Sequence, residues 1–279
     1  MKLSVITPTK NSCAYIIPNL ESVHLLQSNL DIEHIIIDGN SEDSTLDIIT
    51  EFKELYGADI KIVESKDDEG MYHAINKGMR LITGDVWSEL NSDDMYYPGT
   101  VDKILSKFKN RPEIDVVYGN VDMVNELGKF IHTLYLPKFK LEYLILKGYC
   151  LTILQPAMFL RKSVIDTTGF FNTDYKYASD YDYCIRLGKN QKLIHINHSL
   201  TKYRIHTGSI TWGNSERRAI QTNETKEISN KYINDFNIKQ ESILLDDITL
   251  YRNQLHKNNL PYIFKRLNEI FSQPFRKKH

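Results

Sequence analysis

The feature that most constrains this 279-residue chain is an alternation of short apolar runs with amphipathic segments over residues 1–120. The clearest run is Ile35-Ile36-Ile37, a β-branched stretch without a polar break, which is typical of a strand covered on both faces. Similar runs predict strands at 3–6, 60–63, 86–90 and 116–118, with helices between them at 14–26, 44–56, 71–82 and 98–107. Strands that alternate with helices predict a mostly parallel, Rossmann-like α/β sheet flanked by crossover helices.

The alternation ends near Asn120. Residues 121–212 are rich in Tyr and Lys and favour an irregular α+β arrangement, whereas residues 216–270 have a helical pattern throughout. We therefore expect soft boundaries near Asn120 and Trp212.

The composition narrows the class of protein. Hydrophobic residues make up 41% and charged residues 25%, as in ordinary globular domains, and a net charge of −1 does not indicate a nucleic-acid partner. The three cysteines, Cys13, Cys150 and Cys184, lie far apart and predict neither a disulfide framework nor a zinc site. The first residues lack a signal-peptide pattern and no apolar run reaches about 18 residues, so we expect a cytoplasmic protein.

Polar residues follow three of the predicted strands, at 7–11, 38–44 and 91–94. Ligands of open α/β sheets bind beyond the carboxyl ends of the strands. Strand-to-helix loops are polar in most proteins, but three loops of similar chemistry favour a binding site.

Asp93 and Asp94 follow an apolar strand directly, beside Asn91 and Ser92. Carboxylate, amide and hydroxyl oxygens are hard ligands that suit Mg²⁺ or Mn²⁺, and such an ion can neutralise a diphosphate. The alternative is a solvated turn that caps the helix predicted to begin near Pro98.

Asp180 lies at the start of a predicted helix whose apolar side includes Cys184 and Leu187. The helix dipole would keep this carboxylate ionised, as a base that accepts a proton from a hydroxyl must be. The alternative is that Asp180 only caps the helix. Further along, Arg204, His206 and Ser209 could gather around a diphosphate or its metal, although a lone histidine is often structural.

Motifs of several other enzyme classes are missing from the sequence. It contains no G-x-G-x-x-G after the first strand, no Walker A loop, no G-x-S-x-G and no H-E-x-x-H. Dinucleotide oxidoreduction, P-loop hydrolysis, ester hydrolysis and zinc proteolysis therefore lose support.

Taken in order, these segments resemble the family 2 glycosyltransferases of the GT-A fold, of the type that builds bacterial surface polysaccharides. The donor half of that family is matched by residues 3–11, 36–45, 64–78 and 91–94. The acceptor half is matched by residues 154–159, 169–172, 179–182 and 203–209. The resemblance covers roughly residues 3–212. Asn91 stands in place of the first Asp of the family's D-x-D motif, and Ser179 precedes the expected base where an acidic residue is frequent.

The resemblance implies an inverting transfer of a hexosyl or N-acetylhexosaminyl group from a nucleotide-diphosphate sugar, with UDP expected, to a hydroxyl of a glycan or lipid-linked glycan. Capsule, O-antigen and exopolysaccharide synthesis are all compatible with it. Residues 1–120 would bind the nucleotide sugar, 121–215 would bind the acceptor and carry catalysis, and 216–279 would form a helical extension.

The resemblance also implies residue roles. Asp180 would be the catalytic base. Donor contacts would come from Pro8, Thr9, Asn11, Asp38, Asp68, Asn76, Asn91, Ser92 and Arg204. A divalent ion, Mn²⁺ or Mg²⁺, would be held by Asp93, Asp94 and His206. Acceptor contacts would come from Gln155, Tyr181 and Asp182.

Two alternative functions stay open. A nucleotidyltransferase would need a glycine-rich loop after the first strand, and residues 7–11 contain no glycine. A degenerate module that binds nucleotide or polysaccharide without catalysis is supported by Asn91.

The C-terminal residues 250–279 carry seven basic side chains and one acidic, on a helical apolar pattern. This pattern suggests a basic amphipathic helix at an anionic membrane surface, on the inner face of the cell membrane. The alternative is a helix packed on the catalytic domain or on a partner subunit, as in a homodimer.

Overall fold

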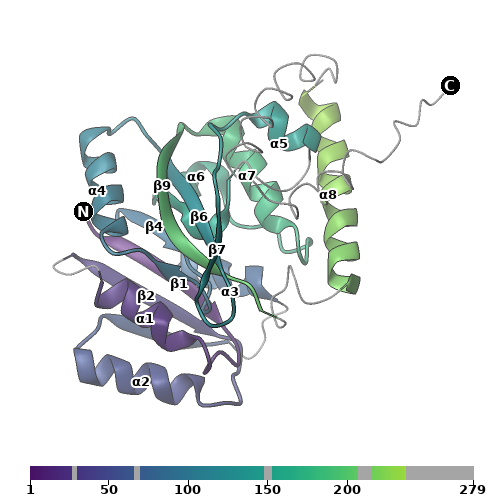
Figure 1. Ribbon diagram of the computed structural model, residues 1–279. Coiled ribbons are helices and arrows are strands. Elements are labelled where there is room, and N and C mark those ends of the chain that lie inside the picture. Colours follow the sequence, from purple (N-terminus) through teal and green to yellow (C-terminus); the bar gives the residue numbers. More distant parts are fainter. Residues whose placement is uncertain (27–29, 66–69, 148–152, 207–214, 237–279) are drawn as a thin grey trace. The chain divides into compact units, whose positions relative to one another are not determined.

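A computed structural model describes residues 1–26, 30–65, 70–147, 153–206 and 215–236 (Figure 1). The chain divides into two compact units, Met1–Ile238 and Lys239–His279, and all described residues belong to the first. The predictions for Asp68, for Ser209 and for the basic C-terminal helix lie outside the described residues.

The first half of the unit is the expected parallel sheet, in the order β3-β2-β1-β4. Its strands are β1 (Leu3–Thr9), β2 (Ile32–Asp38), β3 (Ile60–Glu64) and β4 (Val86–Glu89). Its connecting helices are α1 (Ile16–His24), α2 (Thr45–Tyr56) and α3 (Met71–Met79). Gly57 takes a left-handed conformation, φ 60°, and ends α2 where the sequence predicted. The α/β prediction is confirmed.

The second half continues the same sheet with mixed strand directions, in the order β4-β8-β6-β9-β5, with β7 beside β6. Strand β8 runs antiparallel to both β4 and β6, whereas β9 runs parallel to β6. These strands are β5 (Met95–Tyr96), β6 (Val116–Val124), β7 (Phe130–Leu134), β8 (Met158–Arg161) and β9 (Leu193–Arg204). The helices are α4 (Thr100–Asn110), α5 (Leu141–Lys147), the 3₁₀ turn η1 (Gln155–Ala157), α6 (Val164–Thr168), α7 (Ser179–Asn190) and α8 (Ser215–Phe236). The soft boundary expected near Asn120 therefore falls inside β6.

Helices cover both faces of the parallel half, as the β-branched run predicted. Ile35 and Ile37 pack in the cluster that contains residues of α3 and α7, whereas Ile36 packs with residues of α1 and α2. All three isoleucines are buried. The period-2 alternation of a strand places successive side chains on opposite faces, so an unbroken apolar run needs cover on both.

The helix α8 packs against the domain rather than standing apart from it (Figure 1). Ile228 is buried, the Tyr232 hydroxyl donates to Asp182 at 2.9 Å, and Ser229 meets the Tyr181 hydroxyl at 2.8 Å. The expected boundary at residue 215 thus coincides with the start of a helix that belongs to the first compact unit. Among the described helices, none is both long enough and apolar enough to span a membrane.

Candidate active site

The carboxyl ends of β1 and β2 bring two of the three predicted polar loops together. Thr9 pairs with Asp38 in the parallel ladder, and the Gly39 amide donates to the Thr9 carbonyl at 2.8 Å. Asn11, in a left-handed conformation with φ 50°, links the loops further. Its amide donates to Ser41 Oγ at 2.9 Å, and its side-chain oxygen accepts from the Glu42 amide at 2.8 Å.

The residues at these strand ends that were predicted to contact the nucleotide differ in which polar groups they have available for a ligand. Pro8 and Thr9 are buried, and the Thr9 hydroxyl has no hydrogen-bond partner among the described residues. The Asp38 carboxylate is fully buried and accepts two hydrogen bonds from Ser41, from the amide at 2.9 Å and the hydroxyl at 2.5 Å. The Asp38 carboxylate therefore stabilises the loop that follows β2, whereas the Thr9 hydroxyl is the group without a partner among the described residues.

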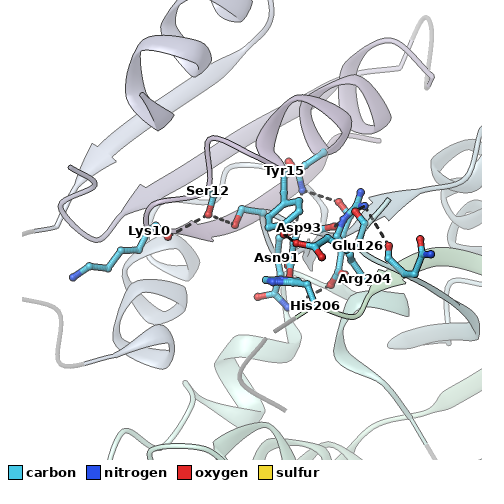
Figure 2. A network of polar contacts seen from close by, with 12 residues as sticks. Lys10, Ser12, Tyr15, Asn91, Asp93, Glu126, Arg204 and His206 are labelled. Atoms are coloured by element: carbon cyan, nitrogen blue, oxygen red, sulfur yellow. Dashed lines mark hydrogen bonds and ion pairs between the residues drawn. The ribbon is translucent and has the colours of Figure 1, made fainter. Parts of the chain in front are cut away.

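The third polar loop, Asn91 to Asp94, rests on the polar side of α1. The Asn19 amide donates to the carbonyls of Asn91 and Asp94, at 2.9 and 3.1 Å. Ser12 and Ser92 join their hydroxyls at 2.8 Å (Figure 2). The predicted capping role of this turn is not observed, because the N-cap of α4 is Gly99.

Asp93 and His206 meet at the surface of this loop, although 113 residues separate them (Figure 2). Their Oδ2 and Nε2 atoms lie 2.9 Å apart, with 24% of the Asp93 side chain and 13% of the His206 side chain exposed. A carboxylate oxygen suits Mn²⁺ or Mg²⁺, and an imidazole nitrogen is a common metal ligand. No group of three His, Cys, Asp or Glu side chains suited to a metal occurs in the described ranges.

Asp94, expected as a third ligand, has a different role. Its side chain is fully buried, and its Oδ1 accepts from the Arg204 amide at 2.9 Å. Burial and the neighbouring Asp93 charge raise the Asp94 pKa well above its ordinary value. Asp94 thus joins the loop to β9.

Arg204, expected on the diphosphate, also has a structural role. Its side chain is buried, and its guanidinium donates to the carbonyls of Asp93 at 3.0 Å and Glu126 at 2.6 Å. The plane also lies over the Tyr15 ring, 5.3 Å from its centroid. With these donors engaged by the main chain, Arg204 holds the Asn91–Asp94 loop against the β6–β7 hairpin.

Asp180 is the second residue of α7, and the capping alternative is not observed. The N-cap is Ala178, which has no side-chain oxygen for the task. The Asp180 carboxylate is 8% exposed and accepts from the Tyr72 hydroxyl at 3.0 Å and from the Tyr181 amide at 2.9 Å. A carboxylate at a helix N-terminus that accepts such hydrogen bonds is stabilised in its ionised form.

Glu89 was not predicted as a site residue, and it lies near both Asp180 and Asp93. Only 2% of it is exposed, and neither carboxyl oxygen has a hydrogen-bond partner among the described residues. Burial raises its pKa well above the ordinary value, and the charges of Asp180 and Asp93 raise it further. Glu89 thus supplies the acidic neighbour of Asp180 that Ser179 does not, and the interpretation of residues 86–90 as an apolar strand did not reveal it.

The residues predicted to contact the acceptor separate into two kinds. Gln155 is 9% exposed, and its amide nitrogen has no hydrogen-bond partner in the described part of the chain. Tyr181 and Asp182 are instead packing residues. The Tyr181 hydroxyl meets the Leu144 carbonyl at 3.1 Å, and Asp182 forms an ion pair with Arg186 at 2.8 Å.

Asn76, predicted to contact the donor, is engaged at both ends of its side-chain amide. It donates to the Phe171 carbonyl and accepts from the Phe171 amide, both at 2.9 Å. Its role is to tie α3 to the segment before α7.

Comparison with known proteins identifies this architecture. A family model described as glycosyl transferase family 2 matches residues 4–169. A PGL/p-HBAD biosynthesis glycosyltransferase of Mycobacterium bovis is 31% identical over 192 residues, which is 68% of this chain and 71% of that protein. An uncharacterized glycosyltransferase of Nostoc sp. is 30% identical over 254 residues, or 86% of this chain and 76% of that one.

Solved structures share the fold. S. aureus TarS 1–349 in complex with UDP-GlcNAc superposes with a TM-score of 0.62 at 20% identity, over 75% of this chain and 60% of that chain. The mannosyltransferase PcManGT from Pyrobaculum calidifontis, in complex with GDP-Man and Mn²⁺, gives 0.59 at 18% identity, over 78% and 60%. The family match, the relatives and the nine-stranded sheet of the described residues agree. The chain therefore belongs to glycosyl transferase family 2 and is a glycosyltransferase.

Proposed function

We propose that this glycosyltransferase inverts the anomeric carbon as it moves a sugar from a nucleotide-diphosphate donor, with UDP as the nucleotide, to an acceptor hydroxyl. The observation that carries the proposal is the Asp180 carboxylate at the N-terminus of α7, held by the Tyr72 hydroxyl at 3.0 Å. Glu89 experiences the charges of both Asp180 and Asp93, which supports a single site that contains the proposed base and the Asp93–His206 pair.

In the proposed reaction Asp180 accepts the proton of the acceptor hydroxyl while the oxygen attacks the anomeric carbon. The new carbon–oxygen bond forms on one face of the sugar as the bond to the diphosphate breaks on the other, which inverts the centre. General-base assistance of this kind is worth about 10² to 10⁴ in rate. Tyr72 and the helix N-terminus orient the carboxylate and keep it ionised before the proton arrives.

Asp93 and His206 would hold the divalent ion, and Asn91 and Ser92 lie on the same loop beside them. When bound, the ion supplies positive charge that neutralises the departing diphosphate. The similarity to a structure in complex with GDP-Man and Mn²⁺ supports the use of a divalent ion. The hydroxyl of Thr9 and the backbone around Pro8 and Asn11 would contact the nucleoside, and Gln155 the acceptor.

For the acceptor we propose a glycan or lipid-linked glycan of a bacterial cell surface. Support comes from the mycobacterial relative, whose name places it in PGL/p-HBAD biosynthesis. The UDP nucleotide is supported by the TarS complex with UDP-GlcNAc. A contact of the basic C-terminal residues with a membrane and a homodimer stay predictions.

The test of the proposed function is Asp180→Asn, which preserves shape and removes the base. We expect turnover to fall by at least about 10²-fold, while the Kd for UDP, measured by calorimetry with Mn²⁺, stays within twofold of wild type. Asp174→Asn, the same exchange at an exposed carboxylate, serves as the matched control and should keep wild-type turnover. Retained turnover in Asp180→Asn, or a collapse of UDP binding with it, would remove Asp180 from the role of base.

A further inference from the structure

Tyr15 joins three segments at the proposed metal site, although the proposed reaction assigns it no part. It lies in the turn before α1 (Ile16–His24), and its amide donates to the Ser12 carbonyl at 2.9 Å. Its ring centroid lies 4.6 Å from that of His206, with the two planes tilted by 41° (Figure 2). Its hydroxyl donates to Glu126 Oε1 at 2.9 Å.

The contact between Tyr15 and His206 is important because His206 lies just after the end of strand β9. Strand β9 ends at Arg204, and the Ile205 amide donates to the Val124 carbonyl at 2.9 Å. His206 is the next residue and lies beyond the end of the strand. The Tyr15 ring and the Asp93 carboxylate are two side-chain groups that contact its imidazole and restrict its direction.

The ring and the hydroxyl of Tyr15 act on different partners. The ring packs against His206 and lies under the Arg204 guanidinium, 5.3 Å from its centroid. The hydroxyl binds the Glu126 carboxylate, while the Glu126 carbonyl accepts from Arg204 at 2.6 Å. The two contributions can therefore be separated by substitution.

We propose that Tyr15 is a positioning residue for His206, whose aromatic ring keeps the imidazole facing Asp93 so that the two side chains bind a divalent ion together. The proposal rests on the proposed function, in which Asp93 and His206 hold that ion. An imidazole that is already oriented loses less side-chain freedom when it coordinates a metal. Residues that orient a ligand in this way change metal affinity by about 10-fold to 100-fold when they are removed.

The experiment measures Mn²⁺ binding to the full-length protein by calorimetry, with and without UDP, and needs no turnover. The variants are Tyr15→Phe, which keeps the ring, and Tyr15→Leu, which removes it. Tyr56→Leu, at the half-exposed end of α2, is the matched control. We expect the Mn²⁺ Kd to rise about 10-fold in Tyr15→Leu and to stay within about twofold of wild type in Tyr15→Phe and Tyr56→Leu.

Asp93→Ala and His206→Ala, measured alongside, separate this proposal from the proposed function. Wild-type Mn²⁺ affinity in Tyr15→Leu, with weakened binding in Asp93→Ala, overturns the positioning role and leaves the metal pair intact. Equal loss in Tyr15→Phe and Tyr15→Leu also overturns it, because the hydroxyl would then be responsible. Wild-type affinity in both Asp93→Ala and His206→Ala would refute the metal pair itself. If thermal melts show that Tyr15→Leu is unfolded at the assay temperature, Tyr15→Met carries the same expectation.

Discussion

Two carboxyl groups at the site, Glu89 and Asp180, are distinguished by their hydrogen bonds. Asp180 accepts from Tyr72 and from the backbone of α7, which favours a charged carboxylate. Glu89 is buried without such bonds, which favours the protonated acid. The hydrogen bonds around Asp180 and the burial of Glu89 thus favour different protonation states in two neighbouring carboxyl groups.

The raised pKa of Glu89 makes a prediction about stability. The unfolded carboxyl releases its proton near pH 4.3, whereas the folded one keeps it to higher pH, so folding loses stability as pH rises above that value. Glu89→Gln imitates the protonated acid and removes this loss. We expect its melting temperature to match wild type near pH 4 and to exceed it increasingly towards pH 7, in thermal melts over that range. A difference that does not change with pH would contradict the raised pKa.

At the scale of the elements, helix α1 makes contacts at the site that its sequence pattern did not reveal. Its apolar side, which includes Ile16, Leu20 and Val23, was visible as a helical period. The neighbouring side carries Asn19, which holds the Asn91–Asp94 loop, and Ser22, which accepts from the Tyr96 amide at 3.1 Å. One helix therefore fixes both the Asn91–Asp94 loop and β5.

Two neighbouring histidines, His24 on α1 and His34 on β2, also connect these two elements. His34 is fully buried, with Nε2 at 2.7 Å from the Thr7 hydroxyl and Nδ1 at 3.3 Å from His24 Nε2. Burial lowers the pKa of His24 to about 4 and that of His34 well below its ordinary value. Both imidazoles are therefore neutral in the folded protein at neutral pH.

This neutral pair predicts acid sensitivity. Below pH 6.5 the unfolded histidines bind protons that the folded ones do not, so the stability they contribute above pH 6.5 is lost as pH falls towards 4. Between pH 7 and 4.5 we expect the free energy of unfolding, measured by urea denaturation, to fall less in His24→Gln than in wild type. His198→Gln, at an exposed histidine, is the control. Identical pH dependence in wild type and His24→Gln would refute the depressed pKa.

At the scale of the whole domain, the two halves share one sheet and divide the site between them. Asp93 follows β4 in the parallel half, whereas His206 follows β9 in the mixed half. Arg204 and Asp94 lock the same two segments together. A ligand held by Asp93 and His206 therefore links the halves, and its binding should stabilise the domain as a unit.

This arrangement predicts a joint effect of nucleotide and metal on unfolding. A ligand that binds only the folded state adds about 2.7 kcal/mol at 100 times its Kd. In a thermal-shift panel of UDP, GDP, CDP and dTDP, with and without Mn²⁺, we expect one nucleotide to raise the melting temperature further when Mn²⁺ is present. His206→Ala should keep the rise with nucleotide alone and lose the part that depends on Mn²⁺. No shift with any nucleotide would favour a module that does not use a nucleotide sugar.

Local patterns were sufficient to predict the parallel half and the loops at its carboxyl ends. The β-branched run at Ile35-Ile36-Ile37 and the glycine at position 57 act over a few residues, so their consequences can be derived without knowing the rest of the chain. Family resemblance added the roles proposed for Asp93, Asp180 and His206. The same patterns also predicted the helix α4 and the first residues of β6, but they did not predict β7 and β8, because these antiparallel strands pair with partners that are not marked by local periodicity.

The identity of the groups that face a ligand depended on long-range packing. Arg204, Asp94, Asn76 and Asp182 all resemble ligand-binding residues in sequence, yet each is buried and bound by a backbone or side-chain group at least 50 positions away. Glu89 and Tyr15 showed no signal in sequence and lie at the site. A polar side chain acts on a ligand only if the folded chain leaves it a free direction, and that depends on contacts between residues up to 113 positions apart.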